Sequence, residues 1–183
     1  MSPLWLVRHA RTLAPAGLCY GKSDLAADEQ ATRDAAQDLA LVLPPGLPVR
    51  CSPLRRCLQL ARALQDLRPD LVHQPDARLT EMDFGDWEGH SWDAIGRAAF
   101  DQWMADFAGH RCGGGESVAE LMARVAPCWH EARAAGSAQV WITHAGVVRA
   151  SRLLARGIAC PRAASEWPVE GLDFGAWAVL DIG

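Results

Sequence analysis

Short apolar runs alternate with helix-forming segments along most of this chain, and no other feature of the sequence restricts the fold as strongly. Three of the runs have the length of buried strands, at residues 4–7, 49–51 and 140–142. A helical pattern follows each of them, and a last apolar run lies at 177–182. Strands separated by helices are typical of a mostly parallel sheet covered on both faces. We therefore expect an α/β fold, a three-layer α/β/α sandwich around a mostly parallel, mixed sheet, with residues 1–183 as a single domain.

Start signals place the helices between these strands. Asp28 can cap a helix, and Ser52-Pro53 supplies an N-cap followed by proline at the first helical position. Ser117 with Glu120 forms a capping box. The helix after Asp28 is expected to bury one face, made of Ala31, Ala35, Leu39 and Val42.

Two further segments complete the pattern. A helix is expected over 147–156, closed by Gly157, while Pro75 restricts any strand within 72–79 to a sheet edge. Residues 82–116 are rich in Gly, Asp, Phe and Trp, with one helix expected over 92–107. We interpret 82–116 as a small cap over a site. The chain holds eight Trp against one Tyr, and we expect most of these indoles in the core.

Composition excludes several functional classes. The formal net charge of −4 argues against a nucleic-acid partner, because such proteins need surplus cations. The apolar runs are too short to cross a bilayer, so no membrane partner is expected. Six scattered cysteines form no C-x-x-C pair, and the first residues show no secretory signal. These features predict a reduced, cytoplasmic protein.

Charged side chains follow three of the expected strands. Arg8 and His9 follow the first, Arg56 lies in the first turn of the helix after the second, and His144 follows the strand at 140–142. The carboxyl ends of parallel strands share one edge of a sheet, where ligands bind. Guanidinium groups and helix N-termini both favour phosphate oxygens. The pattern therefore predicts a site for a dianion.

Five sequence blocks resemble one known family. They read LVRHART at 6–12, SPLRRCLQLA at 52–61, LTEMDFGDWEG at 79–89, GGES at 114–117 and THAGV at 143–147. In this order they resemble the conserved blocks of the histidine phosphatase superfamily, which is also called phosphoglycerate-mutase-like. The compact length is most similar to bacterial α-ribazole phosphatases. The resemblance implies a phosphomonoesterase acting on a small metabolite, with α-ribazole 5'-phosphate in cobalamin biosynthesis as the specific expectation.

The resemblance also implies roles for individual residues. His9 is expected to attack phosphorus and to carry a phosphohistidine intermediate. Arg8, Arg56 and a protonated His144 are expected to stabilise the transferred phosphoryl group. Glu81 is expected to act as general acid and then as base, with Asp83 as the alternative.

The sequence departs from the family pattern at two positions. Ala10 stands where the signature usually has Gly, and Pro15 stands near a customary Asn that contacts phosphate. Tyr20 and Lys22 are the candidates to replace that Asn. The remaining residues expected to bind substrate or phosphate are Thr12, Gly21 and Ala145.

Neither a metal nor a cofactor is expected, because no pair of ligands has metal-site spacing and two arginines would repel a cation. Three alternative functions stay open. They are a phosphoglycerate-type mutase, which usually carries more insertions than this chain, a phosphoprotein phosphatase of the same superfamily, and a non-catalytic module that binds a phosphorylated ligand. The expected partner is a small phosphomonoester, and the sequence leaves the oligomeric state open.

Overall fold

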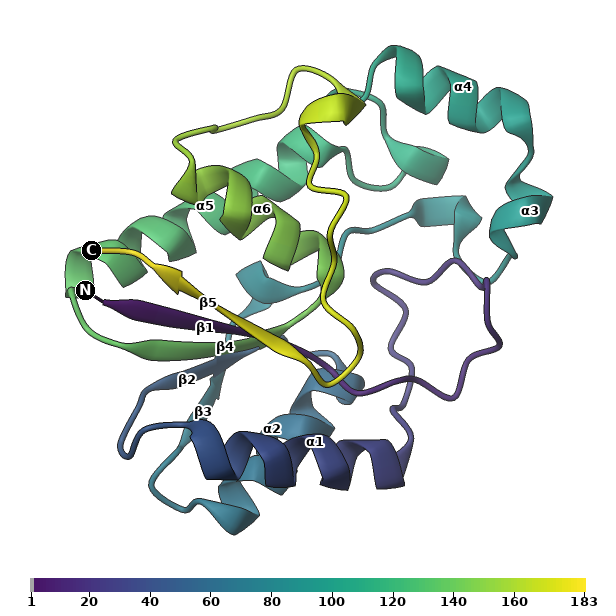
Figure 1. Cartoon of the computed structure of the whole chain (residues 1–183). Helices are drawn as coiled ribbons and strands as arrows, with labels where there is room; N and C mark the ends of the chain where they lie inside the picture. Colours follow the sequence, from purple (N-terminus) through teal and green to yellow (C-terminus); the bar gives the residue numbers. More distant parts are fainter. Residues whose placement is uncertain (1) are drawn as a thin grey trace.

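Five strands form one mixed sheet in the computed structural model, which describes residues 2–183 (Figure 1). The strands lie in the order β3-β2-β4-β1-β5, and only β5 runs antiparallel to its neighbour. Their bounds are β1 Pro3–Arg8, β2 Val49–Cys51, β3 His73–Pro75, β4 Gln139–Thr143 and β5 Trp177–Asp181. The expected mostly parallel, mixed sheet is therefore confirmed, and β3, which contains Pro75, is an edge strand.

Helices cover both faces of the sheet (Figure 1). Two of them, α1 (Glu29–Val42) and α2 (Arg55–Leu67), pack below it in that view, while α5 (Val118–Ala135) and α6 (Ala145–Ala155) lie above it. Short 3₁₀ turns link these elements at Ala77–Leu79, Gly85–Trp87, Cys112–Gly114 and Ala164–Glu166. The three-layer expectation is confirmed.

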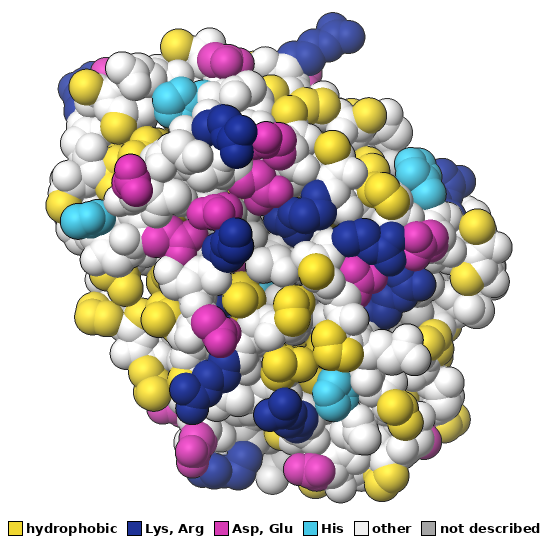
Figure 2. Space-filling view, turned by 180° about the vertical axis from the view of Figure 1, so that it is seen from behind, with side chains coloured by type: hydrophobic (Ala, Val, Ile, Leu, Met, Phe, Trp, Pro, Cys, Tyr) yellow, Lys and Arg dark blue, Asp and Glu magenta, His cyan; other side chains and the backbone are white. Residues whose placement is uncertain are grey.

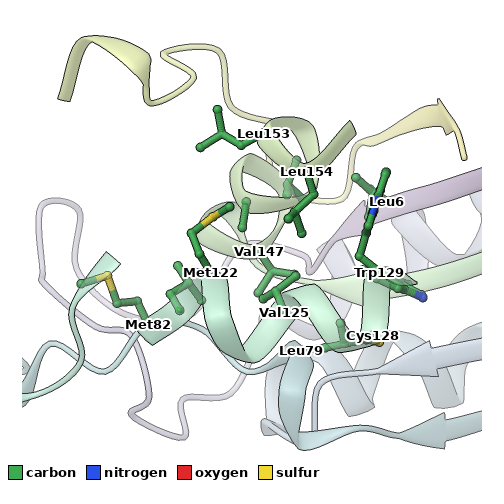
Figure 3. Packing of buried hydrophobic residues seen from close by; sticks show 14 of the residues in the cluster. Leu6, Leu79, Met82, Met122, Val125, Cys128, Trp129, Val147, Leu153 and Leu154 are labelled. Carbon is green, nitrogen blue, oxygen red and sulfur yellow. The ribbon is translucent and has the colours of Figure 1, made fainter. Parts of the chain in front are cut away.

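Two hydrophobic clusters explain why the strands are buried on both faces. Trp141 points into the cluster under α5 and α6, whereas its neighbours Val140 and Ile142 point into the cluster under α1 and α2. This alternation is the two-residue period of a strand. Figure 3 shows Val125 of α5 and Val147 of α6 within the first of these clusters. The core thus fixes the direction of each strand, and with it the positions of the residues that follow the strands.

The helix starts at Asp28 and Ser117 were predicted correctly. Asp28 accepts the backbone N–H of Ala31, and Ser117 with Glu120 forms the reciprocal capping box. The inward face of α1 was predicted only in part. Val42 is 43% exposed, and the buried positions of α1 are Thr32, Ala35, Ala36 and Leu39. The helix packs through this slightly rotated face, and Leu43 after it is buried instead.

Three other helix boundaries differ from the prediction. The expected helix over 92–107 is divided into α3 (Trp92–Ile95) and α4 (Arg97–Ala105), because Gly96 has φ +84°. Helix α2 begins at Arg55 after an N-cap at Leu54, since the Ser52 hydroxyl bonds to His144 and does not cap the helix. Helix α6 begins at Ala145, two residues earlier than expected.

Seven of the eight tryptophans belong to, or pack against, the two hydrophobic clusters, as expected, but most of them are not fully buried. Only Trp129 and Trp141 are fully buried. The remaining indoles are half-buried, and several of them belong to an aromatic group around α3 and α4. Unlike leucine side chains, indoles combine a large apolar face with a polar N–H, and this favours partly exposed walls.

No helix within residues 2–183 is long and apolar enough to cross a membrane. The six cysteines are all free thiols. Figure 2 shows one face of the molecule, on which cationic and anionic side chains are intermingled and do not form a patch of one sign.

The capping box of α5 offers a test of the fold. Replacing Ser117 with Ala removes the acceptor for the Glu120 N–H, which is a part-buried contact at the start of the longest helix. We expect Ser117→Ala to lower the free energy of unfolding by about 1 kcal/mol in urea titrations. Ser165→Ala, at an exposed serine, is the matched control. An equal change of the free energy of unfolding in the two variants would contradict a stabilising role of the capping box.

Candidate active site

Three strand ends bring the expected side chains together. Arg8 at the end of β1 pairs with Thr143 at the end of β4, and Cys51 at the end of β2 pairs with Ile142. His9, Ser52 and His144 are the next residues of these three strands. The imidazole rings of His9 and His144 lie 5.1 Å apart between centroids. The structure therefore unites both histidines at the carboxyl edge of the sheet, as the sequence predicted.

His9 has a defined tautomer. Its Nδ1 lies 2.7 Å from the carbonyl oxygen of Ala10, so Nδ1–H is the donor and Nε2 keeps its lone pair. Arg56 Nε donates to His9 Nε2 at 3.2 Å. Burial lowers the pKa of His9 to about 3, and the Arg56 charge acts in the same direction. The ring is therefore neutral near pH 7, with a nucleophilic nitrogen directed at a guanidinium.

Arg56 is fully buried, and backbone carbonyls hold it in place. Its terminal nitrogens donate to Ser23 O at 2.7 Å and to Gly21 O at 2.6 Å. Glu88 in turn accepts the backbone N–H groups of Lys22 and Ser23 at 2.8 and 2.7 Å. Glu88 thus fixes the loop that fixes Arg56, and Arg56 contacts the ring of His9.

His144 is also fully buried. Its Nε2 lies 2.8 Å from the Ser52 hydroxyl, while Nδ1 has no hydrogen-bond partner among the described residues. Burial holds the pKa of His144 well below its ordinary value, and the Arg56 charge acts in the same direction. Both effects favour the neutral ring in the protein alone, and the imidazolium expected beside a bound phosphoryl group stays a prediction. A bound dianion would raise the pKa again.

A cavity of about 990 Å³ lies over His9 and is rich in arginine. Four arginines line it, namely Arg8, Arg11, Arg56 and Arg149. Arg8 donates to Leu172 O at 2.7 Å and lies over the Phe174 ring, 3.8 Å from its centroid. Arg11 is paired with Asp28 at 3.5 Å. Such a set of guanidinium groups around a neutral imidazole suits a phosphate group.

Glu81 and Asp83 occupy different places. Glu81 lines the His9 cavity and accepts the backbone N–H of Gly146 at 3.1 Å. Asp83 lines a separate charged depression, where it pairs with Lys22 at 3.3 Å. Of these two carboxylates, only Glu81 therefore shares a cavity with His9.

The remaining expected site residues fall into two groups. Thr12 and Tyr20 line the cavity and bond to each other at 3.2 Å between hydroxyl oxygens. Gly21, Lys22 and Ala145 do not line it. Gly21 acts through its carbonyl on Arg56, and a side chain there would overlap Met82 O. Of the two candidates to replace the customary Asn, Tyr20 lies in the cavity and Lys22 does not. Pro15 forms part of the cavity wall.

Sequence reasoning missed Arg149, Phe174, Ser52 as a partner of His144, and Glu88 as the support of the Arg56 loop. Arg149 lies four residues after Ala145 on α6, which places both on one helix face. That spacing was an available signal. Among residues 2–183, no group of three or more His, Cys, Asp or Glu side chains could hold a metal ion.

Comparisons with known proteins agree with this geometry. The model of the histidine phosphatase superfamily (branch 1) matches residues 4–169. No curated protein sequence matches the chain significantly. Mycobacterial glucosyl-3-phosphoglycerate phosphatase is a similar solved structure; its complex with VO3 has 26% identity and a TM-score of 0.84, covering 99% of this chain and 91% of that one. The protein TTHB049 from Thermus thermophilus has 27% identity and a TM-score of 0.75, covering 98% and 93%.

The depressed pKa of His9 predicts an acid-dependent loss of stability. Below the ordinary pKa of 6.5 the unfolded chain takes up a proton that folded His9 refuses until about pH 3, so stability falls as the pH falls. We expect this histidine to contribute roughly 1.4 kcal/mol per pH unit to the slope between about pH 6 and pH 4. His9→Asn should reduce the slope by that amount in urea titrations.

The matched control is His130→Asn, at an exposed histidine on α5. An unchanged slope in His9→Asn would contradict the neutral state of folded His9.

Proposed function

The chain belongs to the histidine phosphatase superfamily, and from this premise we propose that it hydrolyses a phosphomonoester of a small metabolite through a phosphohistidine on His9. The observation that carries the proposal is the arrangement of His9. A buried, neutral imidazole keeps Nε2 free of a proton beside a cavity lined by four arginines. Phosphoryl transfer needs such a nucleophile together with cations that stabilise the equatorial oxygens.

In the first step His9 Nε2 attacks phosphorus, and the bond from phosphorus to the ester oxygen breaks. Glu81 gives its proton to the departing oxygen. In the second step Glu81 takes a proton from water, the water oxygen bonds to phosphorus, and the N–P bond breaks to release inorganic phosphate. Arg8, Arg56 and Arg149 stabilise the negative charge in both steps. His144 gains a proton when the dianion is bound.

Hydrolysis is favoured over a mutase reaction, in which His9 would return the phosphoryl group to another position of a small acid. One wall of the cavity is the loop that includes Pro15, Ala16 and Gly17, all of which are exposed. A cavity wall that borders solvent favours water as the acceptor of the phosphoryl group, whereas a mutase has to keep water out. The alternative of a non-catalytic module is disfavoured because the expected nucleophile, acid and arginines share one cavity.

The finer assignment follows the sequence resemblance. We propose α-ribazole 5'-phosphate of cobalamin biosynthesis as the substrate and the cytoplasm as the location, which the six free thiols support. Residues 82–116 act as the cap, since Phe84 and Trp92 form part of the cavity lining. The solved mycobacterial relative is named for glucosyl-3-phosphoglycerate, and that compound is the competing substrate to test.

Phosphate release from a metabolite panel tests this function. The panel holds p-nitrophenyl phosphate, α-ribazole 5'-phosphate, glucosyl-3-phosphoglycerate and 3-phosphoglycerate. We expect His9→Ala to lose at least ~10³-fold in kcat and to form no phosphoprotein in an acid-quenched reaction. His130→Ala, at an exposed histidine, is the control. Isomerisation of 3-phosphoglycerate without phosphate release would establish the mutase, and equal rates for wild type and His9→Ala would contradict the nucleophile.

Gly146 offers a separate test of the acid. A methyl group at this position would overlap Glu81 Oε1. We expect Gly146→Ala to displace the carboxylate and to lower kcat/KM, which reports the phosphorylation of His9, by ~10–10²-fold for alkyl phosphates, part of the ~10²–10⁴-fold that a general acid contributes. The loss should be much smaller with p-nitrophenyl phosphate, because its leaving group departs without a proton.

Two variants calibrate this experiment. Glu81→Gln should show the same dependence on the leaving group, whereas Asp83→Asn should show none. A loss of equal size on alkyl and aryl phosphates in Gly146→Ala would indicate general damage to the site, and selective loss in Asp83→Asn would transfer the acid role to Asp83.

A further inference from the structure

A second chamber opens beside the catalytic cavity. It has a volume of about 210 Å³ and shares four lining residues with the larger cavity, namely Glu81, Phe84, Trp92 and Arg149. The two spaces are therefore adjacent, and the expected general acid lines both of them. A group attached to an ester oxygen beside Glu81 would lie next to this chamber.

Aromatic rings form much of the wall. Phe84 meets Trp92 edge-on at 5.3 Å and Trp103 at 6.3 Å between ring centroids. Trp103 stacks on Phe107 at 5.6 Å, and Phe107 meets Trp167 at 5.9 Å. Phe84, Trp92, Trp103 and Trp167 all line the chamber, and each is only half-buried. Helices α3 and α4 bury no residue completely. The rings they supply therefore hold apolar area available for a ligand.

Glu81 also borders a second exit, and its chemistry differs. The depression that contains Asp83 is lined by ion pairs: Lys22 with Asp83 at 3.3 Å, Arg124 with Glu116 at 2.9 Å, and Arg111 with Glu120 at 3.3 Å. These charges already satisfy one another. A leaving group placed there would gain little, so the aromatic chamber is the better place for it.

Arg149 lies at the border between this chamber and the catalytic cavity. Its Nε donates to Pro168 O at 3.0 Å, which connects α6 to the segment that carries Trp167. Arg149 is part of the lining of both spaces. A cation at that border can contact phosphate on one side and the face of an aromatic ligand on the other.

We propose that the chamber binds a planar aromatic ring of the leaving group, so that the preferred substrates are phosphomonoesters with such a ring a short linker away from the ester oxygen. The proposal rests on the proposed function, because it takes Glu81 as the acid that faces the leaving group. It assigns the Trp103 and Trp167 side chains to recognition of the ring and leaves the phosphate end to the strand-end residues.

A pair of substrates with matched leaving groups tests the proposal. 2-Phenylethyl phosphate and n-propyl phosphate are both esters of primary alcohols, so they differ in the ring and hardly at all in leaving-group chemistry. We expect kcat/KM to be ~10–100-fold higher for 2-phenylethyl phosphate, as burial of an aromatic ring of this size implies. Glucose 6-phosphate, a primary ester with a polar ring, should react no faster than n-propyl phosphate.

Substitutions in the chamber test whether its rings cause the preference for 2-phenylethyl phosphate. Trp167→Ala and, independently, Trp103→Leu should move the ratio of the two kcat/KM values toward one. Trp177→Ala, which changes a half-buried indole outside the chamber, should keep the wild-type ratio. A variant that folds poorly loses both rates together and leaves the ratio unchanged, and the wild-type ratio by itself also decides the question.

The outcomes separate this inference from the proposed function. Equal kcat/KM for the two alkyl phosphates, or a preference for glucose 6-phosphate, would overturn the aromatic chamber while hydrolysis through His9 stands. Failure of the wild type to release phosphate from any of the three, with no phosphohistidine trapped, would overturn the proposed function and the chamber with it.

Discussion

The contact between Arg56 and His9 is the interaction on which the rest of the site depends. A guanidinium with no exposed surface is costly to bury unless its N–H groups find acceptors. Here the acceptors are the carbonyls of Gly21 and Ser23 and the Nε2 of His9. The first two fix the side chain, and the third fixes the protonation of the imidazole. Loss of any of these partners would leave a buried donor unpaired, so the chemistry of His9 is tied to the backbone path of a loop that follows it in the chain.

The positive charge of the site stands out against the charge of the whole chain. The chain carries a net charge of −4, yet four arginines line one cavity. Outside it many cations are neutralised locally, as in the cluster of Arg50 and Arg78 with Asp76 and Glu131. The cavity is therefore a small region of positive potential on an acidic molecule. Burial lowers the pKa values of both histidines, and the Arg56 charge acts in the same direction. A dianion bound among the arginines would oppose that contribution of Arg56.

Much of this arrangement could be predicted from the sequence, because it is encoded locally. Strand ends, capping residues and the residues that follow them are short-range features, and His9, Arg56 and His144 were found in this way. Other features depend on tertiary packing. The rotation of α1 that exposes Val42, the use of Ser52 by His144, and the entry of Arg149 into the cavity are set by neighbours far away in the sequence. The half-burial of most tryptophans is also set by tertiary packing, since hydrophobicity alone does not tell an indole inside the core from one packed on its outside.

Residues 81–103 contain both the proposed general acid and part of the proposed leaving-group chamber. Glu81 is the expected acid, Glu88 holds the loop that holds Arg56, and Trp92 and Trp103 line the chamber. Residues 81–88 are constrained tightly: a side chain at Gly21 would overlap Met82 O, and one at Gly113 would overlap Phe84 O. Helices α3 and α4 bury no residue fully and are separated by Gly96, yet Trp92 and Trp103 both pack against Phe84. The Phe84 N–H in turn donates to Glu88 at 3.0 Å, so a change of either ring would act on the Arg56 loop through Phe84 and Glu88.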